Sequence, residues 1–173
     1  QGLSPTEILR MLQQGPNVSD ARFKVTVAEG QTIRQTAKQF KDPEAFVKAA
    51  SNPELIGAIG VKASTLEGFL MPDTYFFDEE PGSEEVVRRM VEHFEKQYAA
   101  LAAEVPGASE RDTLEVVTVA SLVEEESRVK DERPMVAAVI YNRIKKNMPL
   151  GFDSTLQFAL DKYAQRLLDS DKQ

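Results

Sequence analysis

Glu115-Val-Val-Thr-Val-Ala-Ser-Leu-Val-Glu-Glu-Glu-Ser127 is an apolar run that ends in three consecutive glutamates, and the rest of the chain is organised around it. At about 100° per residue, this stretch predicts a helix in which Val119 lies about 20° and Val123 about 60° from Glu126. Glu124 lies about 160° away from Glu126, so these two carboxylates cannot face a common ligand. The triplet is therefore not a metal site, and Glu126 is the acid expected beside aliphatic side chains.

Burial among aliphatic side chains would destabilise the charged form of the Glu126 carboxyl and raise its pKa. A glutamic acid that holds its proton near neutral pH can act as a general acid. Helical phase alone leaves a second interpretation open, in which Glu126 ends a buried helix and reaches solvent or an arginine. Phase thus makes Glu126 a candidate catalytic residue.

The composition is that of a globular protein, with 173 residues, 42% hydrophobic and 28% charged, enough for one domain or two small ones. A net charge of -7 without any large Lys/Arg cluster argues against nucleic-acid binding. The absence of cysteine excludes disulfides and thiolate-ligated zinc. The single histidine, His93, leaves no His-based metal cluster and is expected on the surface of a charged helix. We expect no metal and no cofactor.

Targeting signals are not visible in the chain. No run approaches the roughly 18 apolar residues of a transmembrane helix, and no signal peptide is present. The chain begins inside what reads as a capped helix at Ser4, which suggests a fragment or a processed form.

Helix-start residues and apolar spacing predict a helix-rich α+β fold. The expected helices cover residues 4–15, 32–40, 42–50, 52–57, 83–101, 115–127, 131–144 and 154–163. Thr32, Asp42, Asn52, Ser83, Asp131 and either Ser154 or Thr155 are the expected caps. Asp153 reads either as a partner in the last of these caps or as a polar group presented to a cleft.

One strand is expected at residues 22–27, where Phe23, Val25 and Val27 alternate with polar residues. The aromatic-rich segment at residues 66–77 suits a loop that leads into a short extended piece. Two interpretations of this loop stay open, a plug for the hydrophobic core and a wall that stacks sugars. Residues 104–111 are expected to form a linker.

Four motifs occur in series: Ala120-Ser-Leu-Val-Glu-Glu-Glu126; Ile140-Tyr-Asn-Arg143; Met148-Pro-Leu150 followed by Asp153 and Thr155; and Leu66-Glu-Gly-Phe-Leu-Met-Pro-Asp-Thr-Tyr75. Together with Val25-Thr-Val-Ala-Glu-Gly30 and Thr32, they resemble the YceG-like family of endolytic murein transglycosylases. The resemblance spans essentially the whole chain. It implies a partial LysM-like subdomain at residues 1–28, a helical and loop part at 29–110, and catalytic helices at 111–173.

The resemblance implies that Glu126, the last acid of its motif, is catalytic. It also implies Asn142, Asp153 and Thr155 as substrate-binding residues of the cleft, with Glu67 and Asp73 as more peripheral polar groups. The family cleaves the bond from N-acetylmuramic acid to N-acetylglucosamine and leaves a 1,6-anhydro end. In that chemistry one carboxyl acts as acid and then as base, so no second carboxylate is needed.

The family also implies peptidoglycan strands as substrate, peptidoglycan synthases of the elongation machinery as partners, and an amino-terminal membrane helix that places this domain outside the cytoplasm. This chain departs from the family in one loop, where Gly151 and Ser154 stand in place of a glutamine and a proline. It also stops before later family segments that help to build the cleft, so the resemblance leaves open whether this piece alone is active.

Other functions stay open from the sequence. One is a non-catalytic peptidoglycan-binding or scaffold module, and another is an ordinary hydrolase that pairs Glu126 with Glu67 or Asp73. A pyridoxal-phosphate lyase is disfavoured because no Gly-rich turn supplies a phosphate cradle.

Overall fold

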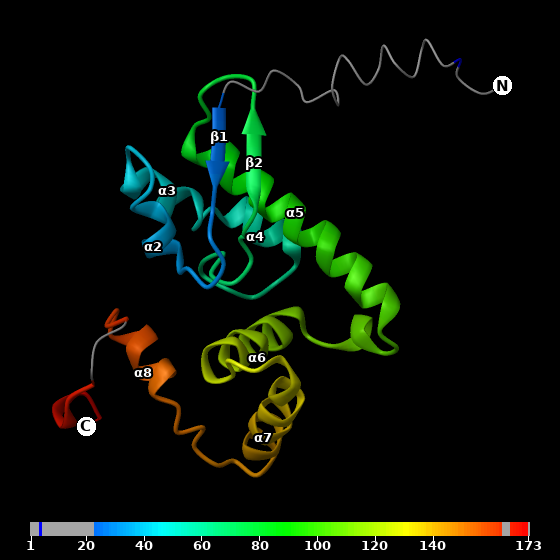
Figure 1. The fold of residues 1–173 in the computed structure, drawn as a ribbon, viewed down its shortest axis with the longest axis vertical. Coiled ribbons are helices and arrows are strands. Elements are labelled where there is room, and N and C mark those ends of the chain that lie inside the picture. Colours follow the sequence, from blue (N-terminus) through cyan, green and yellow to red (C-terminus); the bar gives the residue numbers. More distant parts are fainter. Residues whose placement is uncertain (1–3, 5–22, 164–166, 173) are drawn as a thin grey trace.

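The computed structural model describes Ser4, residues 23–163 and residues 167–172. The chain folds into a first part that combines two strands with helices α2 to α5, and a second part formed by α6 to α8 (Figure 1). This helix-rich α+β architecture confirms the predicted fold class. The helix predicted at residues 4–15 and most of the LysM-like segment lie outside the described residues.

The sheet consists of β1 (Phe23–Thr26) and β2 (Thr74–Phe77), which pair antiparallel although 48 residues separate Thr26 from its partner Thr74. Val25 is half-buried and Val27 is buried, as the alternation predicts. Phe23 lies at the outer end of the pair and remains 36% exposed.

Three short helices follow β1, and each begins where the sequence predicts. They are α2 (Ile33–Ala37), α3 (Pro43–Ala49) and α4 (Pro53–Ile59). The side chains of Thr32, Asp42 and Asn52 accept hydrogen bonds from the first-turn amides. These amides have no partner inside the helix, so the caps fix where each helix starts.

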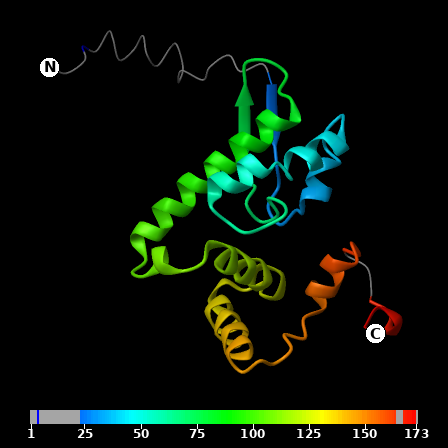
Figure 2. The same ribbon diagram turned by 180° about the vertical axis from the view of Figure 1, so that it is seen from behind.

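The long helix α5 (Ser83–Glu104) lies against the sheet and runs diagonally toward the second part (Figures 1 and 2). Its buried face carries Val86, Val87, Met90, Val91 and Phe94. The prediction that Ser83 caps this helix is wrong, because Gly82 occupies the extended cap position and no side chain bonds there.

His93 is half-buried on α5 rather than on the surface, and the prediction of a surface residue is wrong. Its Nδ1 lies 3.4 Å from the hydroxyl of Tyr75, in β2, and 3.4 Å from Oδ2 of Asp73, the residue before β2. These long-range neighbours, which the helix periodicity of α5 does not reveal, cover one side of the imidazole.

The aromatic-rich loop fills the core of the first part. Leu66 and Phe69 have no exposed surface, and Phe69 packs edge-on against Phe94 with ring centroids 5.2 Å apart. The core-plug interpretation of the loop is therefore the one that the structure supports. Each fully buried side chain of this size contributes about 1.5–3 kcal/mol to folding.

The second part contains α6 (Thr113–Glu126), α7 (Arg133–Lys145) and α8 (Asp153–Ala159), with 3-10 turns at Ala108–Glu110, Lys130–Glu132 and Asp169–Lys172. A second, smaller hydrophobic cluster forms here from Val119, Val123 and Ile140. The division into 1–28, 29–110 and 111–173 stays a prediction.

Two predicted caps of the second part are wrong. Asp131 lies inside the 3-10 turn, and Glu132 precedes α7 without a side-chain cap. Ser154 and Thr155 lie inside the first turn of α8, which begins after Phe152. Their hydroxyl groups bond elsewhere, as described below.

The aromatic-rich loop of the first part contacts α6 of the second part. A Cβ added at Gly68 would lie 2.8 Å from Val117 Cγ1 of α6, so the loop backbone touches this helix directly. Gly68 has a φ of +83°, a conformation that glycine adopts without steric cost. Leu114 and Val117 pack against the first core, whereas Val119 and Val123 belong to the second.

Candidate functional site

The end of α6 is fixed by packing and by its C-terminal cap. Val119 and Val123 pack against Ile140 of α7, which has no exposed surface. Ser127 follows the helix and is 2% exposed, with its amide donating to the Val123 carbonyl at 3.0 Å. Its hydroxyl donates to the Val129 carbonyl at 2.8 Å, so the chain turns sharply after Glu126.

Glu126 itself is exposed, and the expectation that aliphatic neighbours enclose it is wrong. The helical phase is right, since Val119 and Val123 on the same arc are buried. Helical phase gives the direction in which a side chain points. It does not show how far along the helix the neighbouring elements extend to cover that side chain. The aliphatic cluster ends one turn before Glu126, so the carboxyl extends past it to the surface.

A hydroxyl group of α8 contacts the Glu126 carboxyl. The hydroxyl of Ser154, in the first turn of α8, donates to Glu126 Oε1 over 2.7 Å. A hydroxyl can donate to a carboxylate and can also accept from a protonated carboxyl, so Ser154 can orient Glu126 in both protonation states. The contact brings α8 to the end of α6.

Arg143 of α7 holds the loop that delivers Ser154. Its guanidinium donates to the carbonyl of Leu150 and lies 5.7 Å from the ring centroid of Phe152. The Arg143 carbonyl accepts from the Met148 amide at 2.9 Å, which closes the C-terminal end of α7. The position of the first turn of α8 therefore depends on this arginine.

The predicted substrate-binding residues of this region lie in different settings. Asp153 is the first residue of α8 and is exposed beside Ser154 in sequence. Thr155 is half-buried, and its hydroxyl donates to the Phe152 carbonyl at 2.6 Å within its own turn. Asn142 is exposed on the last part of α7. Asp153 and Thr155 thus flank Ser154, the residue that contacts Glu126.

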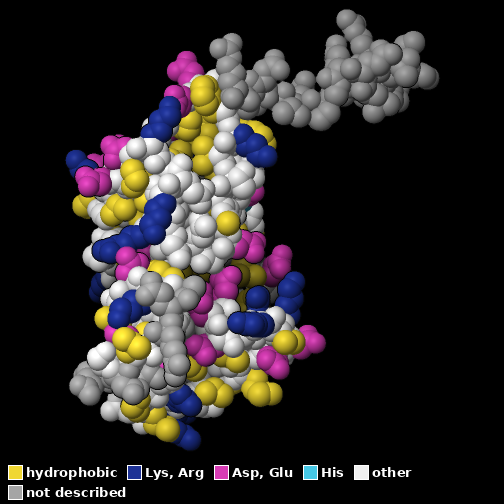
Figure 3. Space-filling view, turned by 60° about the vertical axis from the view of Figure 1, so that its left-hand side comes forward, with side chains coloured by type: hydrophobic (Ala, Val, Ile, Leu, Met, Phe, Trp, Pro, Cys, Tyr) yellow, Lys and Arg dark blue, Asp and Glu magenta, His cyan; other side chains and the backbone are white. Residues whose placement is uncertain are grey.

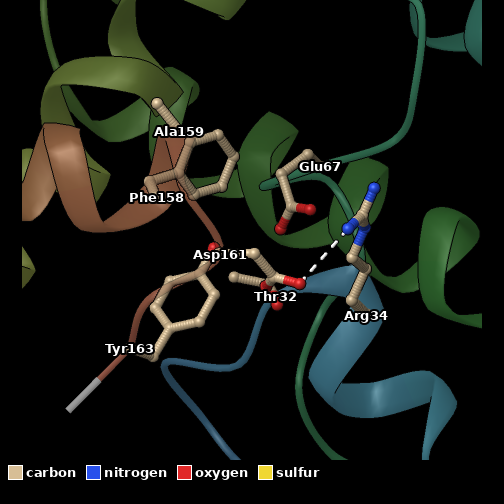
Figure 4. Close-up of a pocket in the computed structure, with 7 residues that line it drawn as sticks. All are labelled: Thr32, Arg34, Glu67, Phe158, Ala159, Asp161 and Tyr163. Carbon is tan, nitrogen blue, oxygen red and sulfur yellow. Dashed lines mark hydrogen bonds and ion pairs between the residues drawn. The ribbon is translucent and has the colours of Figure 1, made fainter. Parts of the chain in front are cut away.

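Glu67 lines a pocket of about 240 Å³ between the start of α2 and the end of α8 (Figure 4). Both of its oxygens lie 3.2 Å from the Ile33 amide, which donates to them. Burial raises the pKa of the Glu67 carboxyl above its ordinary value of 4.5, and the Ile33 amide offsets part of that effect. The other walls include Arg34, Phe158 and Tyr163.

Asp73 interacts within the first part of the molecule. Its Oδ2 faces His93 of α5, and its backbone carbonyl accepts from the Val27 amide at 2.9 Å. The adjacent Tyr75 hydroxyl donates to the Met71 carbonyl at 2.6 Å. Burial, with a smaller contribution from the Asp73 charge, raises the pKa of Tyr75 to about 12.

On the face shown in Figure 3, acidic side chains gather around a hollow where the first part of the molecule meets the second. Within the described ranges, no three acidic or histidine side chains are placed to hold a metal ion. The Glu126 carboxyl, with the Ser154 hydroxyl 2.7 Å from Oε1, can supply acid and base chemistry.

Sequence reasoning missed Ser154 as a partner of Glu126, because a hydroxyl at a helix start is normally assigned to the cap. The departure of this position from the family's proline was the available signal. Reasoning from the sequence also missed Arg34, Phe158 and Tyr163 as pocket residues. No local pattern could have found them, because Arg34 and Tyr163 are far apart in the chain.

Comparisons with known proteins agree on one family. The family model described as "YceG-like family" matches residues 1–173. The endolytic murein transglycosylase of Bacillus subtilis is 29% identical over 175 residues, covering 99% of this chain and 45% of that protein. The endolytic murein transglycosylase of Streptococcus pneumoniae serotype 2 is 27% identical over 195 residues, covering 96% of this chain and 35% of that protein. This chain therefore spans less than half the length of these relatives.

The fold has also been seen in a solved structure. A crystal structure of a YceG-like protein from Listeria monocytogenes superposes with a TM-score of 0.74 and 26% sequence identity. The match covers 98% of this chain and 62% of that one.

Proposed function

The chain belongs to the YceG-like family, and from this premise we propose that it is the catalytic part of an endolytic peptidoglycan transglycosylase. The protein would cleave the MurNAc-GlcNAc bond within nascent glycan strands and leave 1,6-anhydroMurNAc ends, which terminates strand elongation. The names of its relatives support the substrate class. The observation that carries the proposal is Glu126 at an accessible helix end, oriented by the Ser154 hydroxyl at 2.7 Å.

Glu126 would serve in two successive proton transfers. Its carboxyl first protonates the glycosidic oxygen while the bond from that oxygen to C1 of the muramic acid breaks. The C6 hydroxyl of the same sugar then forms a bond to C1, and its proton passes to the Glu126 carboxylate. The acid is regenerated and no water is consumed, so one carboxyl completes the cycle. Ser154 contacts Oε1, and we assign Oε2 to the substrate.

Because Glu126 is exposed, its carboxyl must lose contact with water in another way before it can act as an acid. The aliphatic enclosure that the sequence suggested is missing, so desolvation must come from the glycan strand as it covers the carboxyl. Such a design suits an enzyme that cuts within a polymer, because an open site admits a strand from the side. The acidic surroundings do not repel the sugar backbone, because N-acetylglucosamine carries no charge and the lactyl carboxyl of N-acetylmuramic acid is neutralised where it is amide-linked to a stem peptide.

An ordinary hydrolase would need a second carboxylate about 5–9.5 Å from the first, placed to activate water or to attack the sugar. The sequence offers two candidates: Asp73, which faces His93 in the first part, and Glu67, which accepts the Ile33 amide and lines the pocket beside α8. We propose the single-carboxyl mechanism because it needs neither of them. Product analysis tests this directly, because a reducing end in place of an anhydro end would identify water as the nucleophile.

The cell-wall substrate places the proposed activity outside the cytoplasm. We infer that the full-length protein is held at the cytoplasmic membrane by a single amino-terminal helix, with peptidoglycan synthases of the elongation machinery as its partners. Among the described residues, every helix is too short or too polar to cross a bilayer.

The decisive experiment incubates full-length protein with isolated murein sacculi and measures anhydromuropeptides by liquid chromatography and mass spectrometry. Glu126→Gln should abolish their release because the amide can neither donate nor accept the transferred proton in the same way. Glu125→Gln is the matched control, since Glu125 is an exposed neighbour on the same helix. If the wild-type protein releases none, a non-catalytic peptidoglycan-binding scaffold becomes the better description.

A further inference from the structure

The pocket beside Glu67 lies one helical turn from the partner of Glu126. Phe158, which lines the pocket, follows Ser154 by four residues on α8. Residues four apart share one face of a helix and are separated by about 6 Å along its axis. The face of α8 that contacts Glu126 is therefore the face that continues into the pocket.

The walls of the pocket divide into an aromatic and a polar side. The rings of Phe158 and Tyr163 lie on one side, with Glu67 and Arg34 on the other (Figure 4). Phe158 is 53% exposed, which leaves much of its ring available for contact. An apolar ring face opposite hydrogen-bonding groups is the arrangement that binds a sugar, because the C-H face of a sugar stacks on the ring and its hydroxyls bond the polar groups.

The charges of the pocket disfavour an anionic ligand. Arg34 is already paired with Asp161, with Nη1 3.2 Å from Oδ2. Glu67 adds a second carboxyl, so the ionised walls carry one net negative charge. Each Glu67 oxygen has two acceptor sites, and the single Ile33 amide leaves acceptor capacity for ligand hydroxyl groups.

The size of the pocket limits the ligand to about one ring. Its volume of about 240 Å³ lies below the range of roughly 300–1,000 Å³ that is typical for pockets of drug-sized ligands. A single hexosamine ring fits such a space better than a disaccharide. The step of one helical turn from Ser154 also matches the spacing of adjacent sugars along a strand.

We propose that this pocket binds one uncharged N-acetylated hexosamine ring of the glycan strand, next to the bond on which Glu126 acts. The inference rests on the proposed function, and it names Phe158 and Glu67 as substrate-binding residues. Phe158 stacks on the sugar, and Glu67 accepts hydrogen bonds from its hydroxyl groups. Strands that fill the pocket are then held across both parts of the molecule, since Glu67 belongs to the first and Phe158 to the second.

Binding of peptide-free glycan strands to full-length protein carrying Glu126→Gln tests the proposal by isothermal titration calorimetry. Phe158→Ala should weaken binding about tenfold, since a lost stacking contact of this kind corresponds to about one decade in the dissociation constant. Glu67→Gln should weaken it by a smaller factor, because the amide keeps one oxygen. Phe76→Ala is the matched control, since Phe76 is 48% exposed on β2 and outside the pocket.

Phe158→Leu keeps an apolar side chain without a ring face and guards against misfolding of the alanine variant. If Phe158→Leu and Glu67→Gln both bind strands as tightly as the parent, the pocket is not a sugar site and the inference is wrong. If the variants bind strands like the parent and lose affinity only for free lysine, the pocket recognises an ammonium group instead, and the inference is likewise wrong. If the parent itself binds no strand, the proposed function is what fails.

Discussion

Replacing Gly68 by alanine should destabilise the protein and displace α6, the helix that carries Glu126. The backbone at Gly68 has a φ of +83°, and a left-handed conformation costs an L-residue about 1–2 kcal/mol. The new methyl group would also meet Val117 Cγ1 at 2.8 Å. Val117 is stiff at χ1 and cannot swing aside cheaply, so α6 must shift, at a further cost of about 1–3 kcal/mol.

The total of about 2–5 kcal/mol is a large share of the 5–15 kcal/mol that stabilises a typical domain. Urea unfolding followed by far-UV circular dichroism measures the loss. Anhydromuropeptide release by the full-length variant reports the displacement, because Glu126 lies nine residues beyond Val117 on the same helix. We expect activity to fall even where the variant remains folded.

Three further substitutions separate the cost of the left-handed backbone conformation from the cost of the steric contact with Val117. Gly60 has a φ of +74° but open space around its Cβ position, so Gly60→Ala should show the backbone cost alone, about 1–2 kcal/mol. Gly57 lies in α4 with open space and an ordinary φ, so Gly57→Ala should stabilise by about 0.5–1 kcal/mol. Adding Val117→Ala to Gly68→Ala should remove the steric part. If the double variant shows no coupling between positions 68 and 117, the steric argument is refuted.

Three more perturbations follow from the site and its supports. Ser154→Ala and Ser154→Pro should each lower kcat by up to about tenfold, since one hydrogen bond contributes about 0.5–1.5 kcal/mol. Ser121→Ala is the control and should leave kcat unchanged, because the Ser121 hydroxyl donates to the Thr118 carbonyl within α6. If both Ser154 variants keep the kcat of the Ser121→Ala control, the Ser154 hydroxyl does not orient Glu126. Because burial raises the pKa of Glu67 above 4.5, the folded state binds that proton more tightly than the unfolded state, so the associated stability is fully present below pH 4.5 and is lost as the pH rises through the higher folded value. The free energy of unfolding of wild type relative to Glu67→Gln should therefore decrease as the pH rises from 4 toward 7, and a flat or opposite trend in urea titrations contradicts the burial argument. Asp112 caps α6, so Asp112→Ala should cost about 1 kcal/mol in the same titrations, and Asp112→Asn, which keeps an acceptor, should cost clearly less.

Local chemistry made the starts of α2, α3 and α4 predictable, whereas the cap expected at Ser83 of α5 is not formed. Thr32, Asp42 and Asn52 each cap a helix because the first-turn amides have no other acceptor nearby. The same reasoning failed for Ser154 and Thr155, whose hydroxyls are used by Glu126 and by the Phe152 carbonyl. A capping residue can be read from sequence only when no other partner, near in sequence as for Thr155 or distant as for Ser154, takes its hydroxyl.

The candidate site was predictable in identity but not in environment. Motif and helical phase both selected Glu126, and the burial of Val119 and Val123 confirms the phase. Its exposure depends on where α7 and α8 end relative to α6, which is set by packing across residues that lie far apart in sequence. The pocket is still less accessible to sequence reasoning, because it joins Arg34 to Asp161 across 127 positions.

Helix α6 is held by both parts of the molecule, but the carboxyl of Glu126 at its end is held by α8. Its first half, through Val117, packs against the core of the first part, and its second half, through Val123, packs against Ile140 in the second. Both contacts fix the helix axis, yet neither reaches Glu126. The carboxyl is therefore aimed by α8, which Arg143 anchors through the loop before it. Because α8 also carries Phe158 of the pocket wall, a strand bound in the pocket as we propose would contact the same helix that orients Glu126.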